Sequence, residues 1–204
     1  MIDLVLATHN LDKVRELAHA LQGLPLNVVS VAEIGAWPEV EETGATLQEN
    51  ALLKARFVLG HTGRASLADD TGLEVDALQG APGVRSSRYA GEGCSYADNV
   101  NKLLRDLSGV PAAQRTARFR CVVALADPDG RERWVEGAVE GIILTAARGD
   151  GGFGYDPVFF VPEIGKSFAE MTLAEKTAVS HRGRAVRAAR MVLQEWYGGE
   201  ELRG

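Results

Sequence analysis

Apolar runs and amphipathic segments alternate along the chain, and this alternation predicts an α/β fold. Residues 2–7 are almost continuously apolar, which is typical of a strand covered on both faces. Asn10 is a good N-cap for the helix that follows, where apolar residues recur at helical spacing until Gly23 and Pro25 end the pattern. Residues 26–31 are predicted to form a second strand.

Capping boxes predict three further helix starts. Thr46, Ser95 and Thr172 each stand three residues before a glutamate or an aspartate, as this motif requires. The helix after Thr46 is expected to end at Gly60. A last helix is expected after Ser180, and its buried stripe would consist of Ala185, Ala189, Val192, Leu193 and Trp196.

The acidic pair Asp69-Asp70 is predicted to lie between two short strands, residues 65–69 and 72–78. Residues 117–125 alternate as a strand does, and the turn at residues 127–130 predicts that the next strand returns as a hairpin. We find no linker and no internal repeat. The prediction is therefore a single domain, residues 1–204, with a mixed, twisted central sheet flanked by helices and two lobes with an active-site cleft between them.

Composition narrows the function classes. The chain has 204 residues, of which 46% are hydrophobic and 25% charged, as in ordinary globular proteins. Its net charge of −6 argues against a broad nucleic-acid-binding surface. Cys94 and Cys121 lack metal-ligand spacing, and no apolar run reaches the length of a membrane span. We expect a reduced, cytoplasmic protein that binds neither nucleic acid nor a membrane.

Two pairs of acids suggest a metal site: Glu41 with Glu42, and Asp69 with Asp70. Acids without clustered histidine or cysteine favour a hard cation such as Mg²⁺, which takes one or two carboxylates together with substrate phosphates. Considered alone, the pair Asp69-Asp70 fits a solvated turn equally well. The interpretation therefore depends on the other segments of the chain.

Several cationic side chains could complete a phosphate site. Lys13 lies one turn inside a helix whose start could bind an anion, although a lysine is more often solvated. Lys54 and Lys176 are further candidates. His181 and Arg182 stand near a helix start, where positive charge is slightly disfavoured, and this local conflict modestly favours a functional role.

A glycine-rich stretch at residues 149–154 formally contains G-x-G-x-x-G. A dinucleotide fingerprint must open a helix, but an extended, proline-interrupted segment follows here, so we reject a Rossmann site. Phe153 could stack on a base, and Asp156 could hold a sugar or a cation. The alternative is a plain turn with a buried phenylalanine.

Two other phosphate chemistries fit poorly. The chain has no Walker A sequence, which argues against a P-loop nucleotidase. A phosphatase of the haloacid dehalogenase type would need an aspartyl nucleophile in a D-x-D arrangement, which the stretch Asp69-Asp70-Thr71 does not provide.

Six motifs, in order along nearly the whole chain, resemble those of the inosine triphosphate pyrophosphatase (HAM1/RdgB-like) family. They are Leu6-Ala7-Thr8-His9-Asn10-Leu11-Asp12-Lys13 with Glu16, Glu41-Glu42-Thr43-Gly44, Ala68-Asp69-Asp70-Thr71-Gly72-Leu73, Gly80-Ala81-Pro82-Gly83, Gly152-Phe153-Gly154-Tyr155-Asp156-Pro157, and Glu175-Lys176 followed by Ser180-His181-Arg182-Gly183.

The resemblance implies a homodimeric, Mg²⁺-dependent hydrolase that splits ITP, dITP and XTP into the nucleoside monophosphate and pyrophosphate. Asp70 would accept a proton from the attacking water. It would also hold the metal with Glu41 or Glu42, and Asp69 would assist. The implied triphosphate contacts are Thr8, His9, Asn10, Leu11, Asp12, Lys13 and Lys54, with Thr71 as a further substrate contact. The implied base and sugar contacts are Phe153, Gly154, Tyr155, Asp156, Lys176, His181 and Arg182.

Two positions depart from the family pattern. His9 stands where the family often has glycine, and Thr71 replaces a frequent serine but keeps its hydroxyl. A preference for hypoxanthine and xanthine over adenine would follow from buried donors that match a 6-keto oxygen, because the 6-amino group of adenine would leave them unsatisfied. A sensor that binds purine nucleotides without turnover is the alternative function.

Overall fold

The chain folds into two compact units in the computed structural model, which describes residues 2–35, 38 and 40–198. Unit 1 comprises Met1–Asp70, Cys121–Gly137 and His181–Gly204, and unit 2 comprises Thr71–Arg120 and Ala138–Ser180. Residues 36, 37 and 39, in the segment that precedes the helix predicted after Thr46, lie outside the described residues. Within the described part of the chain, no helix has the length and apolar character needed to cross a membrane. The single domain with a cleft remains a prediction.

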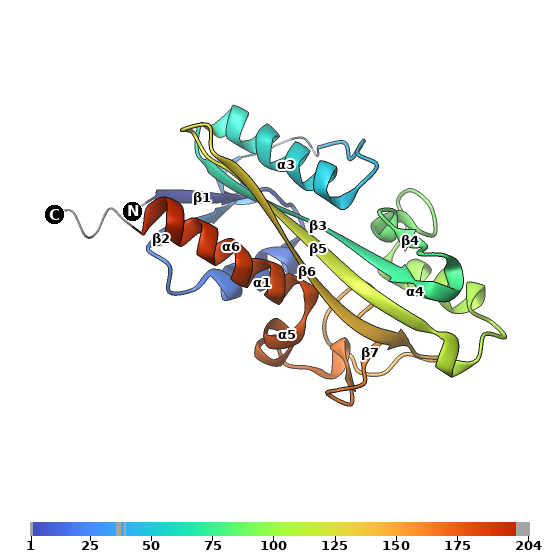
Figure 1. Cartoon of the computed structure of the whole chain (residues 1–204). Helices are drawn as coiled ribbons and strands as arrows, with labels where there is room; N and C mark the ends of the chain where they lie inside the picture. Colours follow the sequence, from blue (N-terminus) through green and yellow to red (C-terminus); the bar gives the residue numbers. More distant parts are fainter. Residues whose placement is uncertain (1, 36–37, 39, 199–204) are drawn as a thin grey trace. The chain divides into compact units, whose positions relative to one another are not determined.

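A mixed β-sheet and its helices confirm the predicted α/β class (Figure 1). The strand order is β2-β1-β3-β5-β6-β7-β8, and β4 pairs with β3. The strands are β1 (Ile2–Leu6), β2 (Leu26–Ser30), β3 (Ala65–Val75), β4 (Pro82–Gly83), β5 (Thr116–Ala126), β6 (Glu132–Ile143), β7 (Phe159–Val161) and β8 (Lys166–Ser167). The α-helices are α1 (Leu11–Leu21), α2 (Val31–Ile34), α3 (Leu47–Thr62), α4 (Tyr96–Asp106), α5 (Leu173–Val179) and α6 (His181–Tyr197). Strand β1 is parallel to β2 and β3, whereas β7 is antiparallel to β6 and β8.

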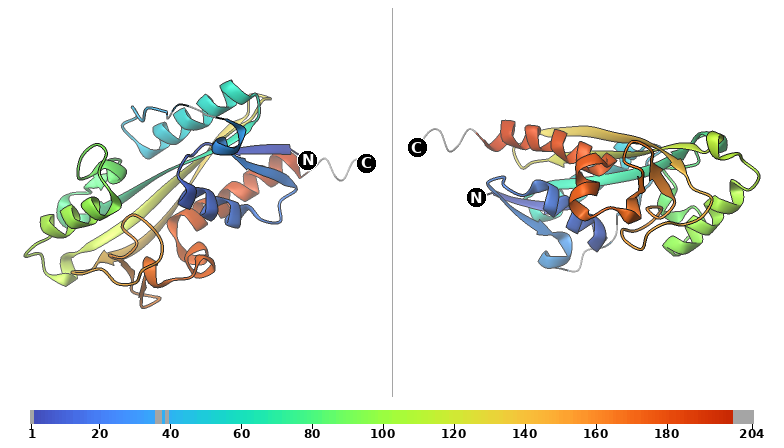
Figure 2. Two further views of the ribbon diagram at one scale, coloured as in Figure 1. Left: turned by 180° about the vertical axis from the view of Figure 1, so that it is seen from behind. Right: turned by 90° about the horizontal axis from the view of Figure 1, so that it is seen from below.

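Unit 1 has three layers, with helices on both faces of its strands (Figures 1 and 2). Helices α1 and α6 pack on one face, where Leu17 and Ala189 join a core that includes Leu67 and Val123. Helix α3 covers the opposite face, and the Ser66 hydroxyl of β3 donates a hydrogen bond to its Ala55 carbonyl. Successive residues of a strand point to opposite faces, so each strand of unit 1 contributes side chains to the packing against the helices on both faces.

Strand β3 corrects the expectation of two short strands with the acid pair at a break. It runs without interruption for 11 residues from Ala65 to Val75, and Asp69 and Asp70 lie inside it. The alternative of a solvated turn at Asp69-Asp70 is therefore wrong. Both carboxylates are buried, and because they are adjacent in a strand they face opposite sides of the sheet.

The predicted helix starts are confirmed, whereas one predicted end is wrong. Side chains of Asn10, Thr46, Ser95 and Thr172 all accept hydrogen bonds from the first turn of the helix that each precedes. Helix α3 continues past Gly60 to Thr62 and ends at Gly63, whose φ of +63° is the left-handed conformation that favours glycine. An interior glycine costs a helix only about 1 kcal/mol, which the packing of α3 outweighs.

The core of unit 2 is rich in aromatic residues. Phe119 of β5 packs against Phe159 of β7, with ring centroids 4.7 Å apart, and both contact Phe168. Leu73 of β3 and Leu103 of α4 close the cluster. This core supports the segment at residues 149–157, which carries the glycine-aromatic motif.

Candidate functional site

The turn between β1 and α1 is built around the cap residue Asn10. Its Oδ1 accepts hydrogen bonds from the backbone N–H groups of Asp12 and Lys13, at 3.0 and 3.2 Å. The Thr8 hydroxyl accepts from the Asn10 N–H at 3.2 Å, while His9 and Leu11 are exposed. Because the cap already engages two of the N–H groups of the helix start, the positive side chain of Lys13 is the stronger candidate for an anion contact.

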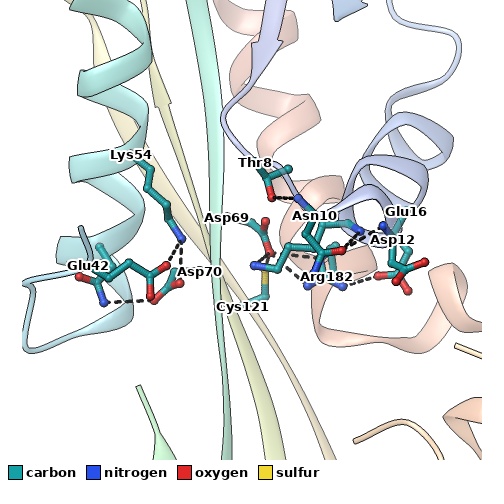
Figure 3. Close-up of polar contacts among 12 residues, drawn as sticks. Thr8, Asn10, Asp12, Glu16, Glu42, Lys54, Asp69, Asp70, Cys121 and Arg182 are labelled. Atoms are coloured by element: carbon teal, nitrogen blue, oxygen red, sulfur yellow. Dashed lines mark hydrogen bonds and ion pairs between the residues drawn. The ribbon is translucent and has the colours of Figure 1, made fainter. Parts of the chain in front are cut away.

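Asp69 and Asp70 belong to two separate polar clusters. Figure 3 shows Asp70 directed toward Lys54 and Glu42, and Asp69 directed toward Arg182 and Cys121. The alternation of side chains along β3 causes this separation. The structure thus brings Asp70 and Glu42 together and places Asp69 elsewhere, which changes the roles that the two acids can have.

The Asp70 cluster contains two carboxylates that converge on one ammonium group. Lys54 Nζ lies 2.8 Å from Glu42 Oε1 and 2.8 Å from Asp70 Oδ1. The side-chain amide of Asn50 donates to Asp70 Oδ2 at 3.4 Å, while its Oδ1 accepts from the Gly44 N–H at 2.7 Å. Asn50 therefore links the loop at Glu42 and Gly44 to strand β3.

Asn50 is the residue of this cluster that sequence reasoning missed. It is fully buried on α3, three residues after the buried Leu47 and one before Ala51. An uncharged polar residue on the buried stripe of a helix was the available signal, since buried amides nearly always have hydrogen-bond partners. Gly44 is equally constrained, because a Cβ there would lie 2.6 Å from Asn50 Oδ1.

Burial and charge set different proton affinities for the two acids of this cluster. Burial, together with the neighbouring Glu42 charge, raises the pKa of Asp70 above its ordinary value, although Lys54 and Lys13 oppose the change. Burial would also raise the pKa of Glu42, but the charge and hydrogen bond of Lys54 outweigh it, so this pKa is lowered. Asp70 is thus the stronger base of the pair.

The Asp69 cluster is a buried ionic network. Asp69 Oδ2 lies 3.1 Å from Lys13 Nζ and accepts hydrogen bonds from Arg182 Nε and Nη2, at 3.2 and 3.1 Å. Arg182 Nη1 also pairs with Glu16. Burial would raise the pKa of Asp69, but Lys13, Arg182 and Lys54 hold it well below the usual range. The Cys121 thiol completes the cluster at 3.9 Å from Asp69 Oδ2.

Residues 153–156 and Lys176 form a second candidate cluster, which lies in unit 2. Asp156 Oδ2 accepts hydrogen bonds from the Phe153 N–H at 2.8 Å and from Lys176 Nζ at 2.5 Å. The Lys176 ammonium lies 4.8 Å from the centroid of the Phe153 ring. Tyr155 is buried and donates its hydroxyl hydrogen to the Ser86 carbonyl, so it supports the loop from within. The tilted rings of Phe153 and Tyr96 lie 5.8 Å apart.

The other predicted site residues are placed as follows. Glu41 is exposed, and the structure joins Glu42 rather than Glu41 to Asp70. His181 and Arg182 are buried in the first turn of α6, and Thr71 is half-buried in β3. Gly154 has a φ of +62°, which favours glycine at this turn.

The described residues contain no group of three or more histidine, cysteine, aspartate or glutamate side chains that could hold a metal ion. Mg²⁺ does not require such a group, because it commonly takes one or two carboxylates together with substrate phosphates and water. The convergence of Glu42 and Asp70 on a cation, the Lys54 ammonium, shows that this pair can face positive charge. The carboxylates of Glu42 and Asp70 therefore fit Mg²⁺ bound together with a polyphosphate.

The turn after β5 contains the D-x-D spacing that a haloacid dehalogenase requires, in Asp127-Pro128-Asp129. Asp127 is buried, and its carboxylate accepts hydrogen bonds from Arg131 at 2.5 Å and from the Tyr197 hydroxyl at 2.9 Å. Its Oδ1 also accepts from the Asp129 N–H at 2.9 Å. These contacts hold Asp127 as the anchor of a hairpin turn, which is a structural role rather than that of a nucleophile.

Comparison with known proteins agrees with the motifs and the fold. Residues 4–192 match the Ham1 family. A dITP/XTP pyrophosphatase of Desulforamulus reducens is 51% identical over 199 residues, which cover 98% of this chain and 99% of that protein. The corresponding protein of Geobacter sulfurreducens is 52% identical over 91% of this chain and 94% of its own length.

Solved structures give the same result. A HAM1 protein from Coxiella burnetii has a TM-score of 0.85 and 41% identity, and the match covers 96% of this chain and 100% of that chain. The Staphylococcus aureus Ham1 protein has a TM-score of 0.83 and 36% identity over 95% of this chain and 98% of that chain. The family resemblance seen in the sequence is thereby confirmed, and the chain belongs to the Ham1 family.

Proposed function

We propose that this protein hydrolyses non-standard purine nucleoside triphosphates, namely dITP, XTP and ITP, to the nucleoside monophosphate and pyrophosphate. The observation that carries the proposal is the convergence of Glu42 and Asp70 on the Lys54 ammonium, with Lys13 as a second cation beside the neighbouring Asp69. Relatives about half identical over nearly the whole chain bear the name dITP/XTP pyrophosphatase. We further propose that it acts in the cytoplasm as a homodimer, on free nucleotides rather than on nucleic acid.

Glu42 and Asp70 would hold Mg²⁺, which when bound neutralises phosphate charge and activates water. Asp70, whose pKa is raised by burial, would accept the proton of the attacking water. The water oxygen forms a bond to the α-phosphorus, and the bond from that phosphorus to the oxygen bridging to the β-phosphate breaks. The electron pair leaves with pyrophosphate, so the products are the monophosphate and pyrophosphate.

Lys13 and Lys54 would contact the triphosphate from two helices, α1 and α3. Phosphoryl transfer depends mainly on positioning and on stabilisation of charge, so two fixed ammonium groups are suited to it. The turn residues 8–12 would line the phosphate side, and Thr71 would add a hydroxyl. Phe153 and the ion pair of Asp156 with Lys176 offer a flat ring and a polar edge to a purine.

Product analysis across a nucleotide panel tests the proposal. With Mg²⁺, dITP, XTP and ITP should each give the monophosphate and pyrophosphate much faster than ATP or GTP does, and EDTA should stop turnover. Orthophosphate as the first product would contradict the proposed reaction. Tight binding of dITP without turnover would instead identify a nucleotide sensor.

A further inference from the structure

Asp69 has a contact pattern unlike that of its catalytic neighbour. Its side chain is completely buried, and its Oδ2 lies 3.1 Å from Lys13 Nζ and 3.1 and 3.2 Å from two nitrogens of Arg182. It faces the layer formed by α1 and α6, whereas Asp70 faces α3. Glu42, the proposed metal partner of Asp70, contacts Lys54 on the α3 side. This geometry separates Asp69 from the pair proposed to hold Mg²⁺.

The two cations that contact Asp69 differ in their access to solvent. The Arg182 side chain is only 3% exposed and is held from its other side by Glu16. The Lys13 side chain is 18% exposed, so Lys13 is the more accessible of these two cations to a dissolved anion. Arg182 would continue to compensate the buried carboxylate if Lys13 also contacted an anion.

The backbone of Lys13 is fixed by the Asn10 cap, but its long side chain has many rotamers in solution. A buried carboxylate 3.1 Å from the ammonium restricts those rotamers before a ligand arrives. Restriction of this kind strengthens binding because less conformational entropy is lost in the complex.

We propose that Asp69 is a positioning residue that orients the Lys13 ammonium toward the polyphosphate of the substrate, and that it is not a metal ligand. The proposal rests on the proposed function in one respect, since it takes Lys13 to be a polyphosphate contact. It predicts that Asp69 and Lys13 act as one unit in polyphosphate binding. The family resemblance instead implies that Asp69 assists Asp70 at the metal.

A double-mutant cycle tests this proposal through binding, without reference to turnover. The proteins are the wild type, Asp69→Asn, Lys13→Met and the double variant. The probe is inorganic tripolyphosphate without metal, and titration calorimetry measures its binding. Asp69→Asn should weaken tripolyphosphate binding about tenfold, a loss within the range of interaction energies typical of residues in contact. Lys13→Met should weaken it at least as much, and the double variant should bind no more weakly than Lys13→Met. Independent, multiplicative losses would overturn the proposal.

Asp127→Asn is the matched control. Asp127 is likewise a buried carboxylate of unit 1 in an ion pair, at 2.5 Å from Arg131. Its removal should lower stability and leave tripolyphosphate affinity unchanged. Equal weakening by Asp127→Asn would show that Asp69→Asn acts only by loosening the fold.

A crystal structure of the wild type with tripolyphosphate gives an answer even if Asp69→Asn does not fold. Lys13 Nζ should donate to a phosphate oxygen while it stays within 4 Å of Asp69 Oδ2, and a Lys13 that has left Asp69 would overturn the proposal. Failure of the proposed function is distinguishable from these outcomes. A wild type that hydrolyses no dITP, but whose binding cycle shows coupling, would refute the reaction and retain the positioning role.

Discussion

Replacing Asp69 or Asp70 with asparagine should change the free energy of unfolding by very different amounts, although the two residues are adjacent. Asp69→Asn removes the carboxylate that compensates Lys13 and Arg182. Neutralising one partner of a buried ion pair typically costs about 3–5 kcal/mol, so we expect a loss of that order in the free energy of unfolding at pH 7. Asp70→Asn should cost much less, because burial and Glu42 disfavour the ionised form of Asp70 and because Glu42 still pairs with Lys54 when Asp70 is neutral.

The dependence on pH follows from the direction of each pKa shift. The pKa of Asp69 is lower in the folded state than in the unfolded chain. Its contribution to the free energy of unfolding is therefore complete well above pH 4 and is lost as pH falls toward the folded pKa. The pKa of Asp70 is raised on folding, so its ionisation destabilises the protein above that pKa and ceases to do so below the ordinary aspartate value. The stability gap between wild type and Asp69→Asn should therefore narrow in acid.

Urea unfolding monitored by tryptophan fluorescence, at pH 7 and at several values down to about pH 3, measures these differences. The reasoning would be refuted if Asp69→Asn were as stable as the wild type at pH 7. It would also be refuted if Asp70→Asn lost as much stability as Asp69→Asn, because the two carboxylates would then share one environment.

Two further substitutions test how the site is held. A Cβ at Gly137 would lie 2.3 Å from the His181 carbonyl oxygen, so Gly137→Ala should displace the start of α6 and cost about 1–3 kcal/mol in thermal or urea unfolding. Gly60→Ala is the control. Gly60 lies within α3 and a Cβ there would extend into open space, so this substitution should stabilise the protein by about 0.5–1 kcal/mol. Asn50→Ala should cost about 1–3 kcal/mol, because the Gly44 N–H and Asp70 lose a buried partner, and an unchanged unfolding midpoint would contradict that account.

The sequence predicted the fold class and the helix starts because both depend on local patterns. Apolar periodicity and capping boxes act within a few residues, and the caps at Asn10, Thr46, Ser95 and Thr172 form as expected. Helix and strand ends were less predictable. Gly60 failed as a helix end because the packed face of α3 continues past it to a glycine, Gly63, that adopts the left-handed conformation.

The separation of Asp69 and Asp70 into two polar clusters could not be predicted from the sequence. Two adjacent acids indicate a turn in most sequences, and only the long pairing of β3 shows that they occupy a strand. Their positively charged partners come from α1, α3 and α6, up to 113 residues away in the sequence. Such partners are fixed by tertiary packing, which local composition does not encode.

The most direct test of the central claim is the kinetics of Asp70→Asn, measured beside its affinity for dITP. Without the proton acceptor, kcat should fall by about 10²–10⁴-fold, while the dissociation constant of dITP measured without metal should stay within a few-fold of the wild-type value. Asp69→Asn should instead weaken binding, in keeping with a role that acts through Lys13. A fully active Asp70→Asn protein would contradict the account, because the proton would then have another acceptor.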